Sequence, residues 1–293
     1  MTAASLDDAL RGATAKLRAA GVENPAREAR LLAELVAGSD DPRTLSSGED
    51  RHLATLVARR ARREPFARIA GVREFWSLDF EVTMDTLIPR PDSETLIECC
   101  LDRFRHRPPA RILDLGTGSG CLIVTLLVTW SGSLGIGVDV SERTCAVAAR
   151  NVLRHGVGDR AWIVCGDWAG ALDSTFDLVV ANPPYVPGHD LAGLDPEVAL
   201  HEPHLAIDGG ADGYACYRRI VPRLSALLSR HGMAVIEHGP DQRDELSGLA
   251  SDHGLDVAGT ADDLGGRHRV LLLAHREPWR KSLESATGLV TVR

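Results

Sequence analysis

The sequence predicts an α/β fold with a doubly wound, mostly parallel sheet of seven strands, joined to a small helical segment at the N-terminus. From residue 111 onward, short apolar runs rich in β-branched residues alternate with helical segments, which is typical of a sheet built from strand–helix–strand units. Several of these runs end directly in glycines, carboxylates or an amide, at the sheet edge where open α/β folds bind ligands. Before residue 64 the apolar residues instead recur at helical spacing.

The composition restricts the class of protein. A chain of 293 residues with 44% hydrophobic and 25% charged residues is typical of a soluble globular protein, and its net charge of −8 argues against non-specific nucleic-acid binding. No apolar run approaches membrane-spanning length, and the N-terminus lacks the pattern of a signal peptide. The six cysteines form no C-x-x-C pair and the histidines have no metal-binding spacing. We therefore expect a reduced, cytoplasmic protein without disulfides, with no metal site and no membrane contact.

Three helices are expected between residues 5 and 63, because apolar residues recur there with helical periodicity. Each helix has start and stop signals. These are Ser5 with Asp8 and Gly21 for the first helix, Asn24-Pro25 and Gly38 for the second, and Ser46 or Ser47 and Arg63 for the third.

The second half of the third helix carries a basic cluster made of Arg59, Arg60, Arg62 and Arg63. A solvated helix face is the favoured interpretation of such a cluster. The alternative is a docking surface for a negatively charged macromolecule.

The segment after this bundle changes period. Alternating residues from Phe75 to Val82 predict a β-hairpin. The following Ile88-Pro89-Arg90-Pro91 is stiff and holds Arg90 between two prolines, and Asp92-Ser93-Glu94 is expected to cap a helix through Leu101. The expected domains are residues 1–70 as a helical substrate-docking domain, 71–90 as a hairpin linker, 91–275 as the main domain and 276–293 as a loose tail.

The expected strands of the main domain are the apolar, β-branched runs. They are residues 111–115, 134–139, 161–167, 176–182 and 233–237, followed by a hairpin of 255–258 and 269–273.

Polar residues at consecutive strand ends predict a cofactor pocket. Gly116-Thr117-Gly118-Ser119-Gly120 follows the first strand and opens a helix, so its backbone can approach a ligand closely. Asp114 before this loop would repel a pyrophosphate but would favour a sulfonium ion. Asp139 is placed to accept both hydroxyls of a ribose, and Asp167-Trp168 can bind an adenine amino group and cover its ring. This arrangement fits S-adenosylmethionine better than NAD, with Asn182 at the next strand end.

Asn182-Pro183-Pro184-Tyr185 leaves the fourth strand and forms a rigid corner. Each proline removes a backbone N–H, so the turn presents acceptors and almost no donors beside an aromatic ring. Such a corner suits a planar group that carries an –NH₂, either an amide or a nucleobase. Four residues alone do not distinguish this role from an ordinary turn with a buried tyrosine.

With these motifs together, the chain resembles the class I methyltransferases with an N-P-P-Y motif, which have a Rossmann-like fold, and more closely the peptide chain release factor glutamine methyltransferases. The resemblance covers roughly residues 5–275. The motifs that carry it are Ile88-Pro89-Arg90-Pro91, Asp114 to Gly120, Asn182 to Tyr185, Glu202-Pro203, Asp208 to Gly213, and Glu237-His238-Gly239. The sequence departs from the family pattern at Asp92-Ser93-Glu94, where Glu-Thr-Glu is usual, and at His201 and His238.

The resemblance implies methyl transfer from S-adenosylmethionine to the side-chain amide nitrogen of the glutamine in the Gly-Gly-Gln loop of class 1 translation release factors, with S-adenosylhomocysteine as product. The Asn182 side-chain oxygen and the Pro183 carbonyl would each accept one N–H of that amide, and Tyr185 would pack on its plane. Pro184 would shape the loop, and Arg90 with Glu202 would shape the substrate mouth. No catalytic histidine or glutamate is expected, since the proton can leave late to water. By analogy with the family we expect a monomer that makes no direct nucleic-acid contact.

Other functions remain as alternatives at this point. One is a methyltransferase for a ribosomal-protein glutamine, and another is an enzyme for the amino group of a DNA or RNA base, which would need a basic reading face. The most distant is a non-catalytic binding module, which would be expected to lose Asn182 or the glycine loop.

Overall fold

The computed structural model describes residues 4–37, 44–170, 172–263 and 265–277, and its elements form two compact units. The helical unit contains the residues up to Arg73 together with Leu194–Glu202. The sheet unit contains Glu74–Gly193 and the residues from Pro203 onward. The segment that follows the N-P-P-Y motif therefore leaves the sheet unit, contributes to the helical unit and returns.

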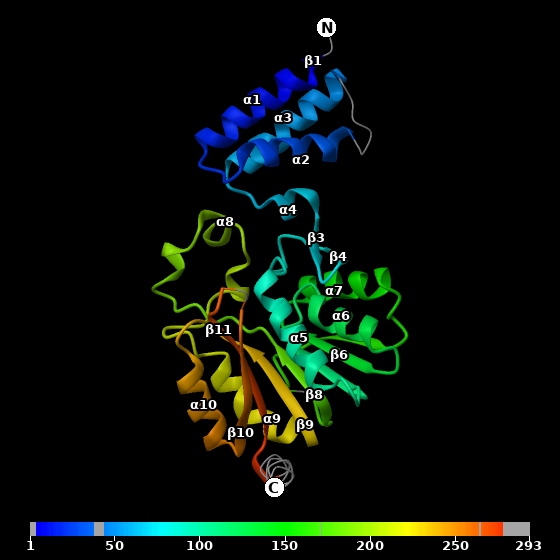
Figure 1. Cartoon of the computed structure of the whole chain (residues 1–293), viewed down its shortest axis with the longest axis vertical. Coiled ribbons are helices and arrows are strands. Elements are labelled where there is room, and N and C mark those ends of the chain that lie inside the picture. Colours follow the sequence, from blue (N-terminus) through cyan, green and yellow to red (C-terminus); the bar gives the residue numbers. More distant parts are fainter. Residues whose placement is uncertain (1–3, 38–43, 171, 264, 278–293) are drawn as a thin grey trace, which may run out of the picture. The chain divides into compact units, whose positions relative to one another are not determined.

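The helical unit is a three-helix bundle (Figure 1), as predicted. Its elements are α1 (Leu6–Ala19), α2 (Pro25–Ala37), α3 (Ser47–Ala61), α4 (Phe66–Ala70), α8 (Pro196–Ala199) and the short paired strands β1 (Ala4–Ser5) and β2 (Thr44–Leu45). Leu17, Leu32 and Leu45 lie fully buried between the three long helices. Amphipathic helices of this length gain most of their stability from such a shared core.

Two helix starts differ in their capping. Ser46 forms a complete capping box with Glu49, which satisfies backbone N–H groups at both ends of the first turn. The expectation for Ser5 is wrong, because its side chain makes no capping hydrogen bond, and Asp8 instead pairs with Arg11. Gly38, the expected end of the second helix, lies outside the described residues.

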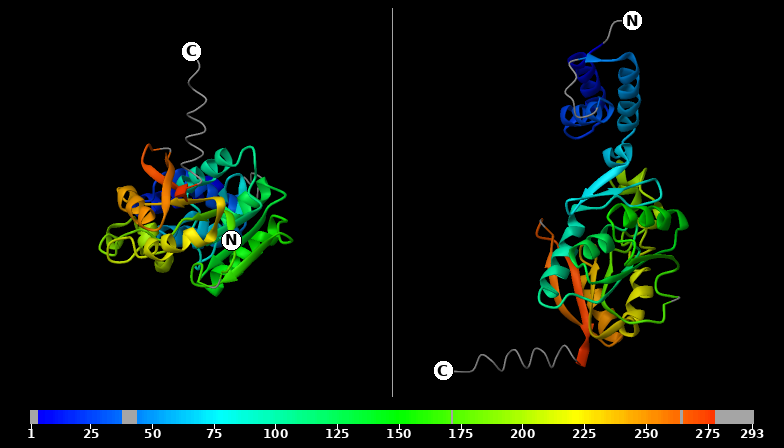
Figure 2. Two further views of the ribbon diagram at one scale, coloured as in Figure 1. Left: turned by 90° about the horizontal axis from the view of Figure 1, so that it is seen from below. Right: turned by 90° about the vertical axis from the view of Figure 1, so that its right-hand side faces the viewer.

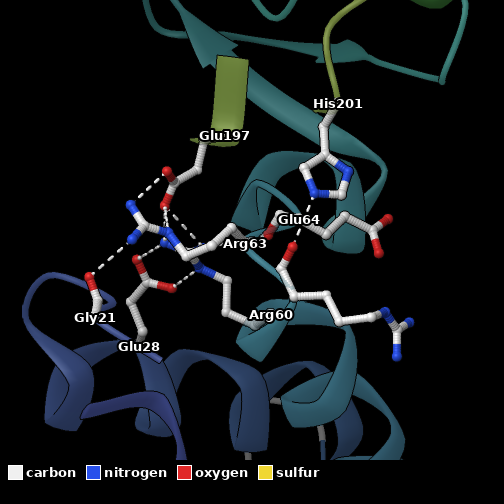
Figure 3. A network of polar contacts seen from close by, with 8 residues as sticks. Gly21, Glu28, Arg60, Arg63, Glu64, Glu197 and His201 are labelled. Carbon is white, nitrogen blue, oxygen red and sulfur yellow. Dashed lines mark hydrogen bonds and ion pairs between the residues drawn. The ribbon is translucent and has the colours of Figure 1, made fainter. Parts of the chain in front are cut away.

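Three of the four arginines in the basic cluster are paired with carboxylates of their own unit, and Figure 3 shows two of them, Arg60 and Arg63. The Arg60 side chain is only 6% exposed and reaches Glu28 at 2.5 Å and Glu197 at 3.1 Å. Arg63 binds the other oxygen of Glu197 at 2.5 Å, and Arg59 pairs with Glu64. The interpretation as a solvated face is therefore wrong for these three arginines. Because these carboxylates neutralise much of the arginines' positive charge, the cluster would attract an acidic partner only weakly.

The sheet unit contains the predicted seven-stranded sheet. Its order is β10-β11-β9-β8-β5-β6-β7, with β5 to β9 parallel and β11 antiparallel to both of its neighbours. The strands are β5 (Arg111–Leu115), β6 (Leu134–Asp139), β7 (Ala161–Cys165), β8 (Phe176–Ala181), β9 (Leu228–Glu237), β10 (Leu255–Asp262) and β11 (His268–His275). All seven expected strands are present. β7 ends two residues earlier than expected, β9 begins five residues earlier, and the final hairpin is longer.

Helices cover both faces of this sheet (Figure 1 and Figure 2). The first face carries α5 (Glu94–Arg103), α6 (Cys121–Thr129) and α7 (Glu142–Arg154), and the second carries α9 (Tyr217–Leu227) and α10 (Arg243–Asp252). Strand β8 shows why its sequence has no polar alternation. Leu178 and Val180 pack on the first face, whereas Val179 and Ala181 pack on the second. The remaining short elements are 3₁₀ helices η1 (Pro91–Ser93), η2 (Leu191–Gly193) and η3 (His204–Ala206).

The predicted hairpin is present as β3 (Val72–Phe75) and β4 (Leu78–Glu81). Trp76 and Ser77 form its two-residue turn with φ values of 53° and 59°, as a turn that matches the strand twist requires. The six cysteines, all within the described residues, are free. No helix in the described ranges is long and apolar enough to cross a membrane. Of the expected tail, residues 278–293 lie outside the described part.

The ion-pair cluster of the helical unit generates a stability prediction. Arg60→Ala leaves Glu28 and Glu197 without their shared cation and should lower the free energy of unfolding of this unit by about 2–4 kcal/mol. Arg62→Ala is the matched control, because this arginine is only two residues from Arg60 but is exposed. It should change the free energy of unfolding by less than about 0.5 kcal/mol. Urea denaturation followed by hydrogen exchange of α1–α3 amides measures both. Equal effects of the two substitutions would contradict the ascribed role of Arg60.

Candidate active site

Strand register brings the predicted site residues to one edge of the sheet. In β5 and β8, Leu115 pairs with Ala181, so the glycine loop and Asn182 both emerge there. Asp139 ends the neighbouring β6, whose Val138 pairs with Leu115. On the other side of β8, Ala181 pairs with Ile236, so Asn182 also lies beside the end of β9. The carboxyl ends of parallel strands are where open α/β sheets bind ligands.

A cavity of about 420 Å³ opens at this edge, within the size range of small-ligand sites. All of its lining residues belong to the sheet unit. The predicted site residues on its wall are Arg90, Gly116, Thr117, Gly118, Ser119, Asp139, Asp167, Trp168, Asn182 and Pro184. Five predicted residues are not on the wall, namely Asp114, Gly120, Pro183, Tyr185 and Glu202.

The glycine loop has the conformation that its sequence requires. Gly116, Gly118 and Gly120 have φ values of 75°, 57° and 82°, a region that other residues rarely adopt. A Cβ on Gly116 would lie 3.2 Å from the Trp168 ring. Trp168 itself has a positive φ of 51°, which costs conformational energy in a residue with a side chain. The indole of Trp168 therefore packs at the cavity wall beside Gly116, which has no side chain to displace it.

Asp114 is hydrogen-bonded to this loop through Thr117. Its carboxylate is fully buried and accepts a 2.7 Å hydrogen bond from the Thr117 hydroxyl, whereas its Oδ1 has no hydrogen-bond partner within the described part of the chain. Burial raises the pKa of Asp114 to about 7. A positively charged ligand in the pocket would lower this pKa and stabilise the carboxylate.

Asp139 lies on the cavity wall and is held there by two backbone hydrogen bonds. Its two oxygens accept from the backbone N–H groups of Gly118 at 3.1 Å and Ser141 at 3.0 Å, which fixes the carboxylate at the pocket wall. Burial raises the pKa of Asp139 above its ordinary value. Each oxygen keeps a further lone pair for a diol. At the adjacent strand end, Asp167 forms an ion pair with Arg219, which also lines the cavity.

Asn182 is held by residues that the sequence reasoning missed. Its Nδ2 donates a 2.9 Å hydrogen bond to the hydroxyl of Ser93, and that hydroxyl donates to Glu237 at 2.6 Å. The segment Asp92-Ser93-Glu94 was expected to cap α5, but the side chain of Ser93, the residue before this helix, makes no capping hydrogen bond. The Ser93 hydroxyl instead donates to the buried carboxylate of Glu237, 144 positions away. No local pattern indicates this pairing, although Glu237 belongs to a family motif.

Tyr185, the last residue of the N-P-P-Y motif, does not line the cavity. Its hydroxyl is 3.5 Å from Glu237, and burial raises the pKa of this phenol well above its ordinary value. Its backbone carbonyl accepts from Gln242 at 3.2 Å. Gly209 and Gly213 approach the Tyr185 backbone so closely that a Cβ would lie at 2.8 Å and 2.6 Å from it. The Asp208–Gly213 segment is therefore a close-fitting support for the N-P-P-Y corner.

Glu202 belongs to the helical unit. Its fully buried carboxylate binds the Arg68 guanidinium at 2.9 Å. The next residue, Pro203, is on the cavity wall of the sheet unit. Glu202 is therefore a buried residue of the helical unit and does not line the cavity.

Comparison with known proteins gives concordant results. The PrmC N-terminal domain family matches residues 8–71, and the methyltransferase small domain family matches residues 92–196. A release factor glutamine methyltransferase of Rhodospirillum rubrum is 44% identical over 268 residues, covering 89% of this chain and 82% of that protein. One of Cereibacter sphaeroides is 42% identical, covering 90% and 96%.

Solved structures show the fold alone. The hMettl16 catalytic domain aligns with a TM-score of 0.56 and 17% identity over 80% of this chain and 86% of that chain. A methyltransferase from Pyrococcus furiosus aligns with a TM-score of 0.51 and 18% identity over 74% and 97%.

The geometry of Asp139 predicts its part in ligand binding. Asp139→Asn should weaken binding of S-adenosylmethionine about 10- to 100-fold, because charge-assisted hydrogen bonds to a ribose become neutral ones. Asp177→Asn is the matched control, since that carboxylate also accepts from two backbone N–H groups but lies at the start of β8. Isothermal titration calorimetry measures both affinities. An unchanged affinity of Asp139→Asn would exclude it as a ribose ligand.

Proposed function

This chain belongs to the release factor glutamine methyltransferase family, and we propose that it methylates the side-chain amide nitrogen of the glutamine in the Gly-Gly-Gln loop of class 1 translation release factors. The observation that carries this proposal is the fixed Asn182 amide at the cavity wall, whose nitrogen is bound to Ser93. Its Oδ1 has no hydrogen-bond partner in the described ranges and is left to accept from a substrate –NH₂.

The cavity residues fit S-adenosylmethionine as the methyl donor. Asp139 would bind the ribose hydroxyls, Trp168 would cover the adenine, and the backbone of the glycine loop would approach the amino-acid end. Asp114 would stabilise the positive charge through the loop that it supports. When bound, the cofactor supplies a methyl group activated on a sulfonium sulfur. A nicotinamide dinucleotide fits less well, since the carboxylate beneath the loop would repel its pyrophosphate.

The chain's own residues would orient the substrate amide. The lone pair of an amide nitrogen is delocalised into the carbonyl, so the nitrogen is a weak nucleophile. Acceptors on both N–H groups, namely Asn182 Oδ1 and the Pro183 carbonyl, hold the nitrogen in place and favour its pyramidal form. These hydrogen bonds strengthen as positive charge develops on the nitrogen, so they lower the barrier rather than only binding the substrate. Pro183 and Pro184 contribute no backbone N–H that would compete.

No side chain is required as a strong base in this mechanism. The nitrogen gains positive charge as the donor loses it, and the product proton can pass to water. Glu237 is fully buried behind Asn182 and does not line the cavity. It therefore orients neighbouring groups and does not take the proton.

Recognition of the protein substrate is assigned to two regions. Arg90 and Pro184 lie on the cavity wall and would contact the glutamine loop. The helical unit would dock the body of the release factor, and the buried Arg68–Glu202 pair would stabilise that unit. Duplex DNA is a poorer substrate for this chain, because Arg60 and Arg63 are engaged by carboxylates and the net charge is −8.

The mechanism predicts the effect of removing the acceptor. Asn182→Ala should lower kcat about 10²- to 10³-fold, because one transition-state hydrogen bond is lost, while cofactor affinity changes less than about threefold. Asn182→Gln should also be impaired, since the longer side chain misplaces the same amide. Labelled methyl transfer to a release factor, a ribosomal protein and duplex DNA, offered in parallel, measures activity and substrate class. Label in DNA alone, or full activity of Asn182→Ala, would refute the proposal.

A further inference from the structure

Three side chains from distant parts of the sheet unit form a continuous hydrogen-bonded series that runs inward from the cavity wall, where Asn182 and Ser93 lie, to Glu237, which does not line the cavity. Glu237 at the end of β9 accepts from Ser93 at 2.6 Å, and Ser93 at the end of η1 accepts from Asn182 at 2.9 Å. Ser93 and Glu237 are 3% and 1% exposed. The Ser93–Glu237 hydrogen bond is therefore buried and is strengthened by its surroundings, whereas the Asn182–Ser93 hydrogen bond is part-buried at the cavity wall.

The direction of each hydrogen bond follows from counting protons. A serine hydroxyl has one proton, and an ionised carboxylate has none to give. The short distance between Ser93 Oγ and Glu237 is typical of a charge-assisted hydrogen bond in which the serine hydroxyl donates to the carboxylate. Ser93 can then only accept from its other neighbour, and the only donor of Asn182 on that side is Nδ2. The carboxylate thus fixes which atom of the Asn182 amide points away from Ser93.

We propose that Ser93 and Glu237 are positioning residues that orient the Asn182 amide with its oxygen toward the substrate. This inference rests on the proposed function, which assigns the accepting role to that oxygen. Ser93 acts through the Nδ2 of Asn182, and Glu237 acts through Ser93. Their contribution is to make the reversed amide, which would present two N–H donors to a substrate –NH₂, unfavourable.

The orientation depends on the charge of Glu237. A protonated Glu237 can donate to Ser93, which frees the Ser93 proton to point at Asn182 and removes the preference for either amide orientation. Burial raises the pKa of Glu237 to about 7. The hydrogen bond from Ser93 and the positive charge of Arg269 lower this pKa, but burial has the larger effect. The charged and titratable groups around Glu237 are Asp92 on η1, Cys121 on α6, Tyr185 after β8, Tyr217 on α9 and Arg269 on β11.

This gives the sign of the pH dependence. The charged form of Glu237 orients the amide, and its fraction falls as the pH drops through about 7. The kcat for methyl transfer should therefore decline on the acid side of this pH, while KM for the release factor changes little.

Substitutions at Ser93 and Glu237 test the series. Ser93→Ala should lower kcat about 10- to 100-fold, because the Asn182 amide loses its fixed orientation toward the reacting group, with KM for the release factor and cofactor affinity within about threefold of wild type. Ser93→Thr keeps the hydroxyl and should restore kcat to within about threefold. Glu237→Gln should have a low kcat without the acid decline, because the charge is absent at every pH. Ser133→Ala is the matched control, since its buried hydroxyl also donates at 2.6 Å but to Pro109, and its kcat should equal that of wild type.

A readout without substrate separates this inference from the proposed function. The infrared carboxyl band that disappears in Glu237→Gln reports the titration of Glu237, and Ser93→Ala should raise its apparent pKa because a stabilising hydrogen bond is lost. Wild-type kcat in Ser93→Ala, no rescue by Ser93→Thr, or an unshifted band would overturn the positioning role. A wild-type enzyme that leaves the release factor unlabelled would refute the proposed function, whereas the band shift would still test the series.

Discussion

The register between β8 and its two neighbours is the constraint on which the site depends. With Leu115 paired to Ala181 and Ala181 paired to Ile236, the residues that follow each strand must meet at one edge. The glycine loop, Asn182 and Glu237 are brought together by this pairing alone. A slip of one residue in β8 would exchange Leu178 and Val180 on one face for Val179 and Ala181 on the other, and it would move Asn182 out of line with the glycine loop. The fold core therefore fixes the catalytic geometry.

Much of this arrangement could be predicted from the sequence because it follows local rules. The alternation of helices and strands, the seven strands and the residues at their ends all follow from apolar periodicity and punctuation by glycine and proline. Ten of the predicted site residues line one cavity. The strand boundaries were less accurate at the start of β9, where Leu228 to His231 belong to the strand although only part of this segment is buried.

The features that escaped prediction are those that depend on tertiary partners. Ser93 precedes a helix, and a local rule assigns it to capping, but the fold places Glu237 within reach of its hydroxyl. The sequence pattern similarly places Arg60 on a solvated basic face, but in the structure Arg60 pairs with Glu197 of α8. In both cases a carboxylate from a segment more than 130 positions away decides the role of a polar side chain, and no periodicity within one segment encodes that pairing.

The most direct test of this account is a crystal structure of the enzyme with S-adenosylhomocysteine and a Gly-Gly-Gln release-factor loop. The account predicts the glutamine –NH₂ within hydrogen-bond distance of both Asn182 Oδ1 and the Pro183 carbonyl, with Asn182 Nδ2 still on Ser93. A glutamine bound away from this corner, or an Asn182 amide that turns its nitrogen toward the substrate, would contradict it.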